Sequence, residues 1–266
     1  MRQVLIAFQF LTLIPFRLKG DFSEKEISKS AAFFPVVGAF QGLLALLSAG
    51  LLLNIFPLDV VIGLIVLILI ASNGGFHIDG LADTFDALAV KSSGNKRTDR
   101  QKRLAVMKDS ATGAIGATAL VFAILLKFVL LKNLFSDSNL VTACLLLFLM
   151  PVFSKWAMIP AIFHGRAAKQ DGLGKIFIEN TGFKELLIAS IFMVGFLLIA
   201  IYISSLSDYF IFLLFSLCVF YILSFLMIKF FENKFGGLTG DTLGTINEIT
   251  EIIFLLMVTG WLRIYT

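Results

Sequence analysis

The stretch VVIGLIVLILIASNGGFHIDGLADTFDAL, residues 60–88, joins an uncharged apolar run to a segment that carries three aspartates and a histidine. The apolar part has the composition of a membrane span, because about twenty such residues cross about 30 Å of hydrocarbon. The acidic part carries charges that are costly at membrane depth and therefore point to a functional site. The stretch as a whole predicts a helical membrane protein with a site at the end of a span.

The rest of the chain shares this apolar character. It has 266 residues, of which 58% are hydrophobic and 15% charged, and its mean hydropathy is +0.94. Soluble domains contain about 25% charged residues, so this composition excludes an ordinary soluble domain. Cys144 and Cys218 lie inside apolar runs and indicate neither a disulfide framework nor a cysteine metal site. The net charge of +4 is modest and does not indicate nucleic-acid binding.

Uncharged stretches of span length recur along the whole chain. Their length and composition predict about seven membrane spans, without an internal repeat or a linker. The predicted spans are residues 31–56, 59–76, 111–133, 140–163, 186–205, 209–231 and 249–265. We therefore expect an all-α, polytopic membrane bundle in which residues 1–266 form a single catalytic domain.

The connectors between these spans are of two kinds. Four, seven, four and two lysines or arginines lie in the connectors 17–30, 77–110, 164–185 and 229–248. None lies in the connectors near Pro57, at 134–139 and at 206–208. Cytoplasmic connectors are rich in lysine and arginine. The alternation therefore predicts that the basic connectors face the cytoplasm and that the C-terminus faces outward.

The first apolar run, from Val4 to Phe16, has positive charge on both sides, with Arg2 before it and Arg17 and Lys19 after it. With about thirteen residues it is too short to cross a bilayer. No small-residue cleavage site follows it, so we do not interpret it as a signal peptide. We expect a re-entrant or interfacial helix; the alternative is a short first span, which would make eight.

The acidic part of the opening stretch has helical spacing. Asp79, Asp83 and Asp86 stand at positions i, i+4 and i+7, which lie on one face of a helix. Neighbouring carboxylates resist ionising together unless a cation lies among them. Mg²⁺ or Mn²⁺ would relieve that repulsion, since both prefer oxygen ligands. The alternative is a solvated acidic cap at the membrane surface.

A second acidic segment is GGLTGDTLGTINEITE, residues 236–251, which also lies directly before a span. Asp241 and Glu248 stand seven residues apart, and Glu251 follows one turn later. Two acidic helices at the same membrane face predict two walls of one site. Such a pair suits a diphosphate held through metal ions, in which the metals bind the attacking and leaving oxygens.

A third segment, RLAVMKDSATGAIGA at residues 103–117, combines cations with a helix start. Arg103 and Lys108 are candidates for phosphate contacts, and Asp109 and Ser110 precede a helix N-terminus that offers N–H donors. The alternative is a set of topology-determining cations beside an ordinary helix cap.

His77 is one of two histidines and precedes Asp79 by two residues. It is a candidate general base or a partner that orients an aspartate, and the alternative is a simple interfacial histidine. His164 and Arg166 begin the third basic connector, whose DGLG at residues 171–174 indicates a turn.

Five segments in order resemble the blocks of the cobalamin synthase family, the adenosylcobinamide-GDP ribazoletransferases. They are FPVVGAFQG (34–42), GGFHIDGLADTFDA (74–87), RLAVMKDSATGAIGA (103–117), RAAKQDGLG (166–174) and GGLTGDTLGTINEITE (236–251). The resemblance covers nearly the whole chain, from about Phe8 to about Glu251. Two positions depart from the family pattern, namely Ala111 and Ala87, where Arg or His and Gly are usual.

The resemblance implies an integral membrane enzyme that depends on Mg²⁺. In that family α-ribazole, or its 5′-phosphate, attacks the phosphoryl group of adenosylcobinamide-GDP, which gives a cobamide and releases GMP. We further expect a multi-pass protein of the plasma or inner membrane, and the charge of the connectors predicts an active site on the cytoplasmic side. A homo-oligomer is left open.

The motifs and the resemblance together define the expected site. The candidate catalytic residues are His77, Asp79, Asp83, Asp86, Arg103 and Lys108. The candidate metal ligands are Asp79, Asp83, Asp86, Asp241 and Glu248. The candidate substrate-binding residues are Asn73, Asp109, Ser110, Arg166, Asn247 and Glu251.

Three other classes share some of these features. Membrane phosphotransferases that act on CDP-alcohols have a D-x2-D-G-x2-A-R block, but here Asp83 stands where that arginine is expected. Membrane prenyltransferases use paired acidic motifs, of which only the segment 79–83 fits. An ion-coupled transporter would place its acidic residues near the bilayer midplane, whereas these lie at the predicted ends of spans.

Overall fold

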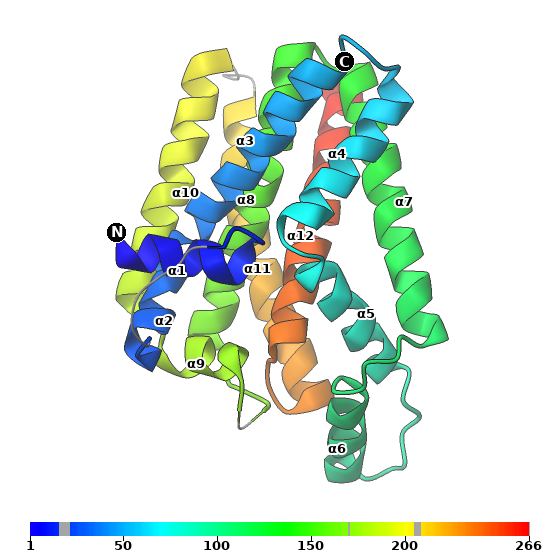
Figure 1. Ribbon diagram of the computed structural model, residues 1–266, viewed down its shortest axis with the longest axis vertical. Coiled ribbons are helices and arrows are strands. Elements are labelled where there is room, and N and C mark those ends of the chain that lie inside the picture. Colours follow the sequence, from blue (N-terminus) through cyan, green and yellow to red (C-terminus); the bar gives the residue numbers. More distant parts are fainter. Residues whose placement is uncertain (16–21, 170, 205–208, 266) are drawn as a thin grey trace.

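A computed structural model describes residues 1–15, 22–169, 171–204 and 209–265. Long helices run side by side along one axis, and most of the short helices lie toward one end of the molecule (Figure 1). The helices are α1 (Arg2–Leu11), α2 (Glu24–Ser30), the 3-10 turn η1 (Ala31–Phe33), α3 (Phe34–Leu52), α4 (Leu58–Ser72), α5 (Phe76–Leu88), α6 (Lys96–Val106), α7 (Ala114–Asp137), α8 (Leu140–His164), α9 (Leu173–Asn180), α10 (Phe183–Ser204), α11 (Phe210–Phe235) and α12 (Gly240–Tyr265). These ranges contain no strand, so the predicted all-α class is confirmed.

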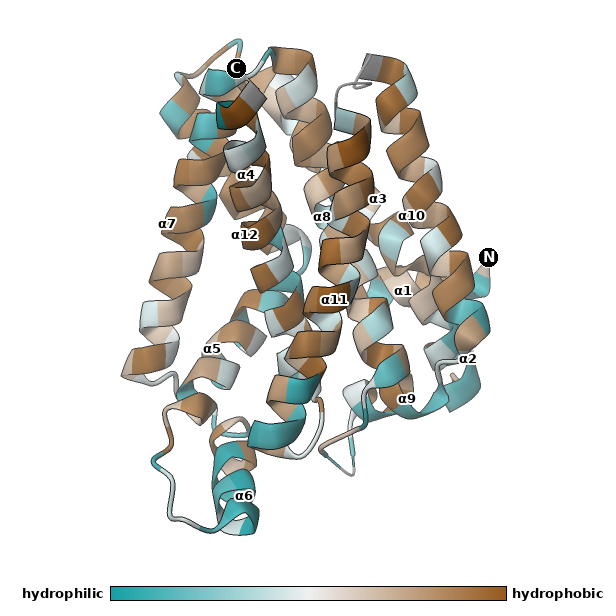
Figure 2. Ribbon diagram, turned by 180° about the vertical axis from the view of Figure 1, so that it is seen from behind, coloured by the Kyte–Doolittle hydropathy of each residue, from teal (hydrophilic) through white to brown (hydrophobic). Residues whose placement is uncertain are grey.

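The long helices account for the predicted spans. Within the described residues, six helices are long and apolar enough to cross a membrane, and a bent pair would make seven. The six are Glu24–Leu52, Ala114–Asp137, Leu140–His164, Phe183–Ile203, Phe210–Phe235 and Gly240–Ile264, and the bent pair is Leu58–Ser72 with Phe76–Leu88. Figure 2 shows the hydrophobic residues along these helices and the hydrophilic ones concentrated in α2, α6 and α9. The protein is therefore a multi-pass helical membrane protein.

The first helix, α1, is not one of the candidate membrane spans. α1 has 10 residues, which at 1.5 Å per residue is about half the thickness of the hydrocarbon. In Figure 1 it lies across the long helices, near α2. This agrees with the expected re-entrant or interfacial helix and not with an eighth span. Phe16, Arg17 and Lys19, which completed the argument from sequence, lie outside the described residues.

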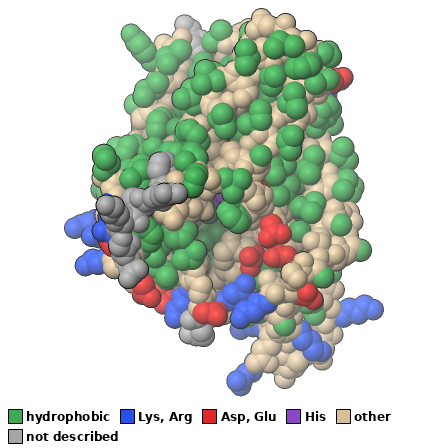
Figure 3. Space-filling model, in the orientation of Figure 1, with side chains coloured by type: hydrophobic (Ala, Val, Ile, Leu, Met, Phe, Trp, Pro, Cys, Tyr) green, Lys and Arg blue, Asp and Glu red, His purple; other side chains and the backbone are tan. Residues whose placement is uncertain are grey.

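The ends of the molecule differ in charge, as the connector pattern predicts. The basic helix α6, the helix α9 and the turn between α11 and α12 lie at the lower end in Figure 1. The turn at Pro57, the α7–α8 turn and the C-terminus lie at the opposite end. In Figure 3 lysine, arginine and acidic side chains gather at the lower end, below a surface that is mostly hydrophobic. The predicted connector at 206–208 lies outside the described residues.

The helix α8 forms the centre of the bundle. It packs against α3, α10, α11 and α12, and 78% of its apolar window is buried, against 28% for α7. Its closest neighbour is α3. A Cβ atom on Gly38 of α3 would lie 2.4 Å from the carbonyl oxygen of Pro151 in α8. A Cβ atom on Gly42 would lie 2.2 Å from the carbonyl oxygen of Phe148. The FPVVGAFQG segment therefore forms a close crossing with α8, since only glycine lets the two backbones approach this closely.

The bend between α4 and α5 positions the acidic helix. The two helices meet at 85°, and the turn uses Gly74 and Gly75 at φ values of +68° and +74°. Such values favour glycine because other residues lack space for Cβ there. The side-chain oxygen of Asn73 accepts a hydrogen bond from the backbone N–H of Gly75 at 3.0 Å. Asn73, predicted to bind substrate, therefore stabilises the bend.

We expect Gly42→Ala to destabilise the protein and Gly50→Ala, in the same helix, to leave its stability unchanged or raised. A Cβ on Gly42 meets the backbone of α8, whereas a Cβ on Gly50 meets nothing within 4 Å. Alanine also has a helix propensity better than that of glycine by about 1 kcal/mol. Thermal unfolding of the two purified variants in detergent measures the difference, and equal unfolding temperatures would contradict this account of the crossing.

Candidate active site

The candidate site is built where α5 crosses the first turns of α12. A Cβ on Gly80 would lie 2.9 Å from the Cα of Asp241, and one on Gly244 would lie 3.1 Å from the Cα of His77. The hydroxyl of Thr245 also donates toward the carbonyl oxygen of Gly80 at 3.1 Å. Two glycines, one on each helix, thus let the backbones touch. The crossing brings the first acidic segment to the beginning of the second.

Three of the predicted carboxylates meet at this crossing. The carboxyl of Asp83 is subject to repulsion from Asp79 and Asp241 and to attraction from Lys169. The Nζ atom of Lys169 donates to Oδ2 of Asp241 at 2.9 Å, and the hydroxyl of Thr239 lies 3.2 Å from the same oxygen. Asp79, Asp83 and Asp241 therefore form an acidic cluster from two helices, with one ammonium group beside it.

The donor set of this cluster suits a hard cation, because all the donors are carboxylate oxygens. Within the described part of the chain, no group of three His, Cys, Asp or Glu side chains converges closely enough to enclose a metal ion. Mg²⁺ in particular takes one or two protein carboxylates and completes its coordination with water and phosphate oxygens. The residues present therefore fit a metal ion shared with a substrate and not a closed protein cage.

Asp86, the third residue of the predicted acidic face, has a different role. Its Oδ2 accepts a hydrogen bond from the backbone N–H of Gly113, and its Oδ1 accepts one from that of Gly116, both at 2.7 Å. These N–H groups belong to the start of α7, where a helix has no internal acceptors for them. The carboxylate caps α7, and this geometry gives no support to Asp86 as a metal ligand.

Glu248 and Glu251 lie in a buried ionic network with lysines of α7 and α8. The Nζ atom of Lys127 donates to Glu248 at 2.7 Å and to Glu251 at 2.5 Å. The Nζ atom of Lys155 donates to the side-chain oxygen of Asn247 at 2.7 Å. All five side chains are at most 5% exposed. Two cations and two carboxylates balance within the network, which joins α7, α8 and α12.

This network corrects three predictions. Glu248 was expected as a metal ligand beside Asp241, and Asn247 and Glu251 were expected to bind substrate. Seven residues of helix carry Glu248 about 10 Å along the axis from Asp241, away from the cluster and between the other helices. The signal that sequence reasoning missed is Lys127 and Lys155, because a lysine inside an apolar span requires a buried partner.

The predicted phosphate contact Arg103 is engaged elsewhere. Its Nη1 donates to the carbonyl oxygen of Lys234 at 3.1 Å, and Arg100 donates in the same way to that of Glu232. Both arginines thus bind carbonyl oxygens in the last turn of α11, where that of Glu232 also accepts the N–H of Gly236 at 3.0 Å. The start of α6 is fixed by Asp99, whose pKa is lowered to about 2 by hydrogen bonds from two serines of the preceding loop.

The remaining predicted contacts lie at the same end of the molecule but outside the cluster. Lys108 forms an exposed ion pair with Asp171 at 3.9 Å. The side chain of Asp109 accepts a hydrogen bond from its own loop, from the N–H of Ala111 at 3.1 Å. Ser110 is exposed in that loop. Arg166 pairs with Glu232 at 3.4 Å.

The connector between α8 and α9 carries a site residue that sequence reasoning missed. It is held against the α11–α12 turn by two backbone hydrogen bonds, from Leu238 to the carbonyl of Arg166 at 2.7 Å and from Ala168 to the carbonyl of Leu238 at 2.8 Å. This pairing places Lys169 on Asp241. The only sequence signal was its position inside the RAAKQDGLG segment.

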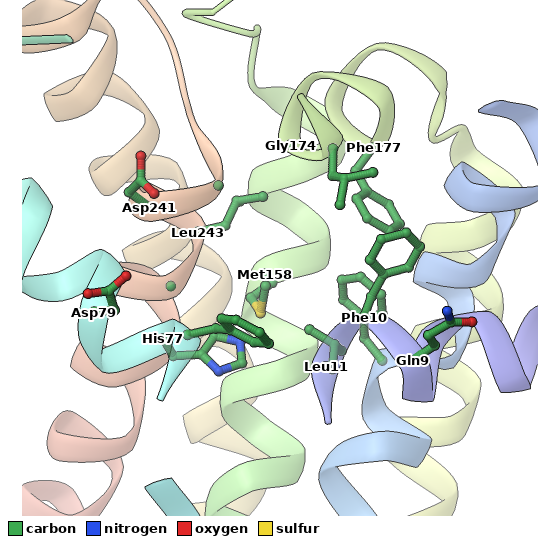
Figure 4. Close-up of a pocket in the computed structure, with 15 residues that line it drawn as sticks. Gln9, Phe10, Leu11, His77, Asp79, Met158, Gly174, Phe177, Asp241 and Leu243 are labelled. Carbon is green, nitrogen blue, oxygen red and sulfur yellow. The ribbon is translucent and has the colours of Figure 1, made fainter. Parts of the chain in front are cut away.

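A pocket of about 500 Å³ opens beside the acidic cluster. Asp79 and Asp241 lie at one side of it and Phe10 and Phe177 at the other, with the ring of His77 between them (Figure 4). The lining residues are Gln9, Phe10, Leu11, Phe34, Phe76, His77, Asp79, Met158, Leu173, Gly174, Phe177, Gly240, Asp241, Leu243 and Gly244. The pocket therefore combines an apolar, aromatic end with a carboxylate end.

Comparison with known proteins gives one consistent result. The family model described as cobalamin-5-phosphate synthase matches residues 3–259. A protein named adenosylcobinamide-GDP ribazoletransferase from Thermodesulfovibrio yellowstonii is 40% identical over 95% of this chain and 94% of its own. Proteins of the same name from Caldanaerobacter subterraneus subsp. tengcongensis and Geotalea daltonii are 35% and 34% identical, over 95% and 96% of this chain and 96% of each of their own. No solved structure matches the chain.

We expect Asp86→Ala to lower the free energy of unfolding by about 2 kcal/mol in buffer without divalent metal, because two hydrogen bonds to a charged group are lost. Asp83→Ala is the matched control and should not destabilise, since it removes a carboxylate that its neighbours repel. Thermal unfolding in detergent with a chelator measures both. A stable Asp86→Ala protein would contradict the capping role.

We expect Lys127→Met to destabilise the protein by about 3–5 kcal/mol, because it leaves two carboxylates buried without their cation. Lys132→Met, in the same helix, removes an exposed ion pair with Asp59 and should cost little. Unfolding temperatures of the two variants make the comparison. Equal effects would show that the buried network does not hold the helices together.

Proposed function

The chain belongs to the cobalamin-5-phosphate synthase family, and we propose that it acts as an adenosylcobinamide-GDP ribazoletransferase at the cluster formed by Asp79, Asp83 and Asp241. The observation that carries this proposal is the crossing of α5 and α12, which brings the three carboxylates together beside a pocket. The relatives that bear this name match nearly their full length. A nucleotide diphosphate is the kind of donor that such a cluster suits.

The reaction replaces a phosphoanhydride bond of the donor with a phosphate ester bond to the acceptor. A ribose hydroxyl of α-ribazole, or of its 5′-phosphate, forms a bond to the phosphorus that carries the cobinamide. The bond from this phosphorus to the bridging oxygen of the diphosphate breaks, and GMP leaves with that oxygen. The hydroxyl proton passes to a base, for which His77 and the aspartates of the cluster are the candidates.

The acidic cluster would hold Mg²⁺ through Asp79, Asp83 and Asp241. When bound, Mg²⁺ would supply positive charge that neutralises the diphosphate oxygens and favours the departure of GMP. The three carboxylates would hold that cation beside the pocket. An uncompensated cluster of this kind would repel the negatively charged donor, so the donor set and the substrate both favour a divalent cation.

Lys169 is the protein's own cation at the site. It pairs with Asp241 and also borders a surface hollow of about 550 Å³ that Lys108 and Asp171 line as well. Lysine is a common phosphate ligand and acts there as a point charge. We propose that Lys169 and Lys108 bind phosphate oxygens of the donor, while Arg103 acts indirectly by holding α6 against α11.

The proposed active site lies toward the end of the bundle that is rich in lysine and arginine. Following the charge rule for membrane topology, we propose that this end faces the cytoplasm of a cell whose plasma or inner membrane holds the protein. A water-soluble nucleotide-linked donor would reach it there. The opposite end carries the bare connectors and the C-terminus (Figure 1).

The activity is tested with membranes that contain the protein, incubated with adenosylcobinamide-GDP, α-ribazole and Mg²⁺. We expect GMP and a cobamide, both measured by chromatography, and loss of both products when a chelator removes the metal. Asp83→Asn should lower kcat/KM by at least about 100-fold, the scale of losing a group that stabilises transition-state charge. Asp59→Asn, on a different part of the bundle, should keep wild-type activity.

The outcomes separate the activity from the residue assignment. Absence of GMP with authentic substrates would refute the proposed activity. Near wild-type turnover of Asp83→Asn at saturating Mg²⁺, with normal protein levels in the membrane, would instead refute the role of the cluster in metal binding.

A further inference from the structure

The pocket beside the acidic cluster is lined by aromatic and apolar side chains at one end and by carboxylates at the other, and this lining indicates which kind of ligand it binds. Its volume of about 500 Å³ lies within the range of sites for small molecules, about 300–1,000 Å³. Three phenylalanines at its apolar end are fixed by edge-to-face contacts. Phe177 packs on Phe10 at 5.5 Å and on Phe34 at 5.3 Å between ring centroids. The pocket therefore has rigid aromatic walls suited to a flat ring system.

One polar side chain in this pocket has no partner. His77 is 4% exposed, and its Nδ1 atom makes no hydrogen bond to any residue that the structure describes. A buried polar atom without a partner costs about 1–3 kcal/mol, so native proteins seldom leave one unless a ligand or water meets it. His77 lies between the aromatic end and the carboxylate end (Figure 4).

We propose that this pocket binds the acceptor nucleoside, with its planar aromatic base against the phenylalanines and a hydrogen bond between that base and Nδ1 of His77. The inference rests on the proposed function, which requires a nucleoside whose ribose hydroxyl reaches the acidic cluster. Asp79 and Asp241 line the same pocket as Phe10 and Phe177. A base held at the aromatic end thus leaves its ribose at the carboxylate end.

The alternative substrate groups fit this pocket less well. The corrin ring of the donor is too large for a pocket of about 500 Å³. Guanine carries donors and acceptors around its edge, and burial among phenylalanine and leucine would leave most of them unpaired. A benzimidazole base has one free ring nitrogen, which a single imidazole N–H satisfies. On this inference His77 binds the base of the acceptor, which leaves the aspartates of the cluster as the candidates for the general base.

The first test compares the Michaelis constants of the two substrates. His77→Leu and Phe177→Leu should each raise the KM for α-ribazole, by about tenfold for His77→Leu, the scale of one hydrogen bond lost in a buried site. The KM for adenosylcobinamide-GDP should stay near its wild-type value. Phe220→Leu is the control, because Phe220 is also buried but packs on Phe153 and Phe254 and does not line the pocket.

The second test measures ligand binding and does not depend on the activity of a variant. The chain has two histidines, and His164 bonds to Tyr221 outside the pocket. With ring-labelled histidine in detergent-solubilised protein, adding α-ribazole alone should shift the NMR signal of His77 and leave that of His164 in place. The His77→Leu protein identifies the signals.

The outcomes distinguish this inference from the proposed function. Release of GMP by the wild type, together with unchanged KM for α-ribazole in both pocket variants, overturns the pocket assignment and leaves the activity intact. A His77 signal that shifts with GMP and not with α-ribazole assigns the pocket to the donor and also overturns it. A signal that shifts only when phospholipid is added assigns the pocket to lipid, with the same consequence.

Discussion

The contact on which the site depends is the crossing of α5 and α12 at Gly80 and Gly244. A Cβ at Gly80 would strike the backbone of α12, and one at Gly244 would lie tight against the backbone of α5. The 85° bend after α4 turns α5 into position for it. The same helix then uses Asp86 to cap α7. One short helix therefore supplies two of the three carboxylates of the candidate site, Asp79 and Asp83, and sets the start of a neighbouring span.

The helix α12 serves two purposes along its length. Its first turn carries Asp241 into the acidic cluster, and two turns later Glu248 and Glu251 bind Lys127. Breaking a buried ion pair is costly because it leaves a charge without a partner, whereas forming one adds little net stability. Here the network fixes the depth and rotation of α12 relative to α7 and α8. That fixed rotation is what directs Asp241 toward α5.

The connectors at the basic end bring the remaining charged groups to the site. The α8–α9 connector pairs with the α11–α12 turn through Leu238, and this contact delivers Lys169 to Asp241. Gly237 permits it, since a Cβ there would lie 2.4 Å from the carbonyl oxygen of Arg166. On the other side, Arg100 and Arg103 hold α6 against the end of α11. The site is thus enclosed by segments far apart in the chain.

Local features of the sequence determined the membrane bundle, the alternation of its connectors and the helix that carries Asp79 and Asp83. Apolar length, charge bias and a spacing of four residues are all properties of neighbours along the chain. They could not show that Asp86 faces α7, that Glu248 pairs with Lys127, or that Lys169 reaches Asp241. Helical periodicity tells which residues share a face, but the partner of each face depends on how the helices pack. Close contacts at glycines and the need to neutralise every buried charge decided those partners, and both are properties of the tertiary structure alone.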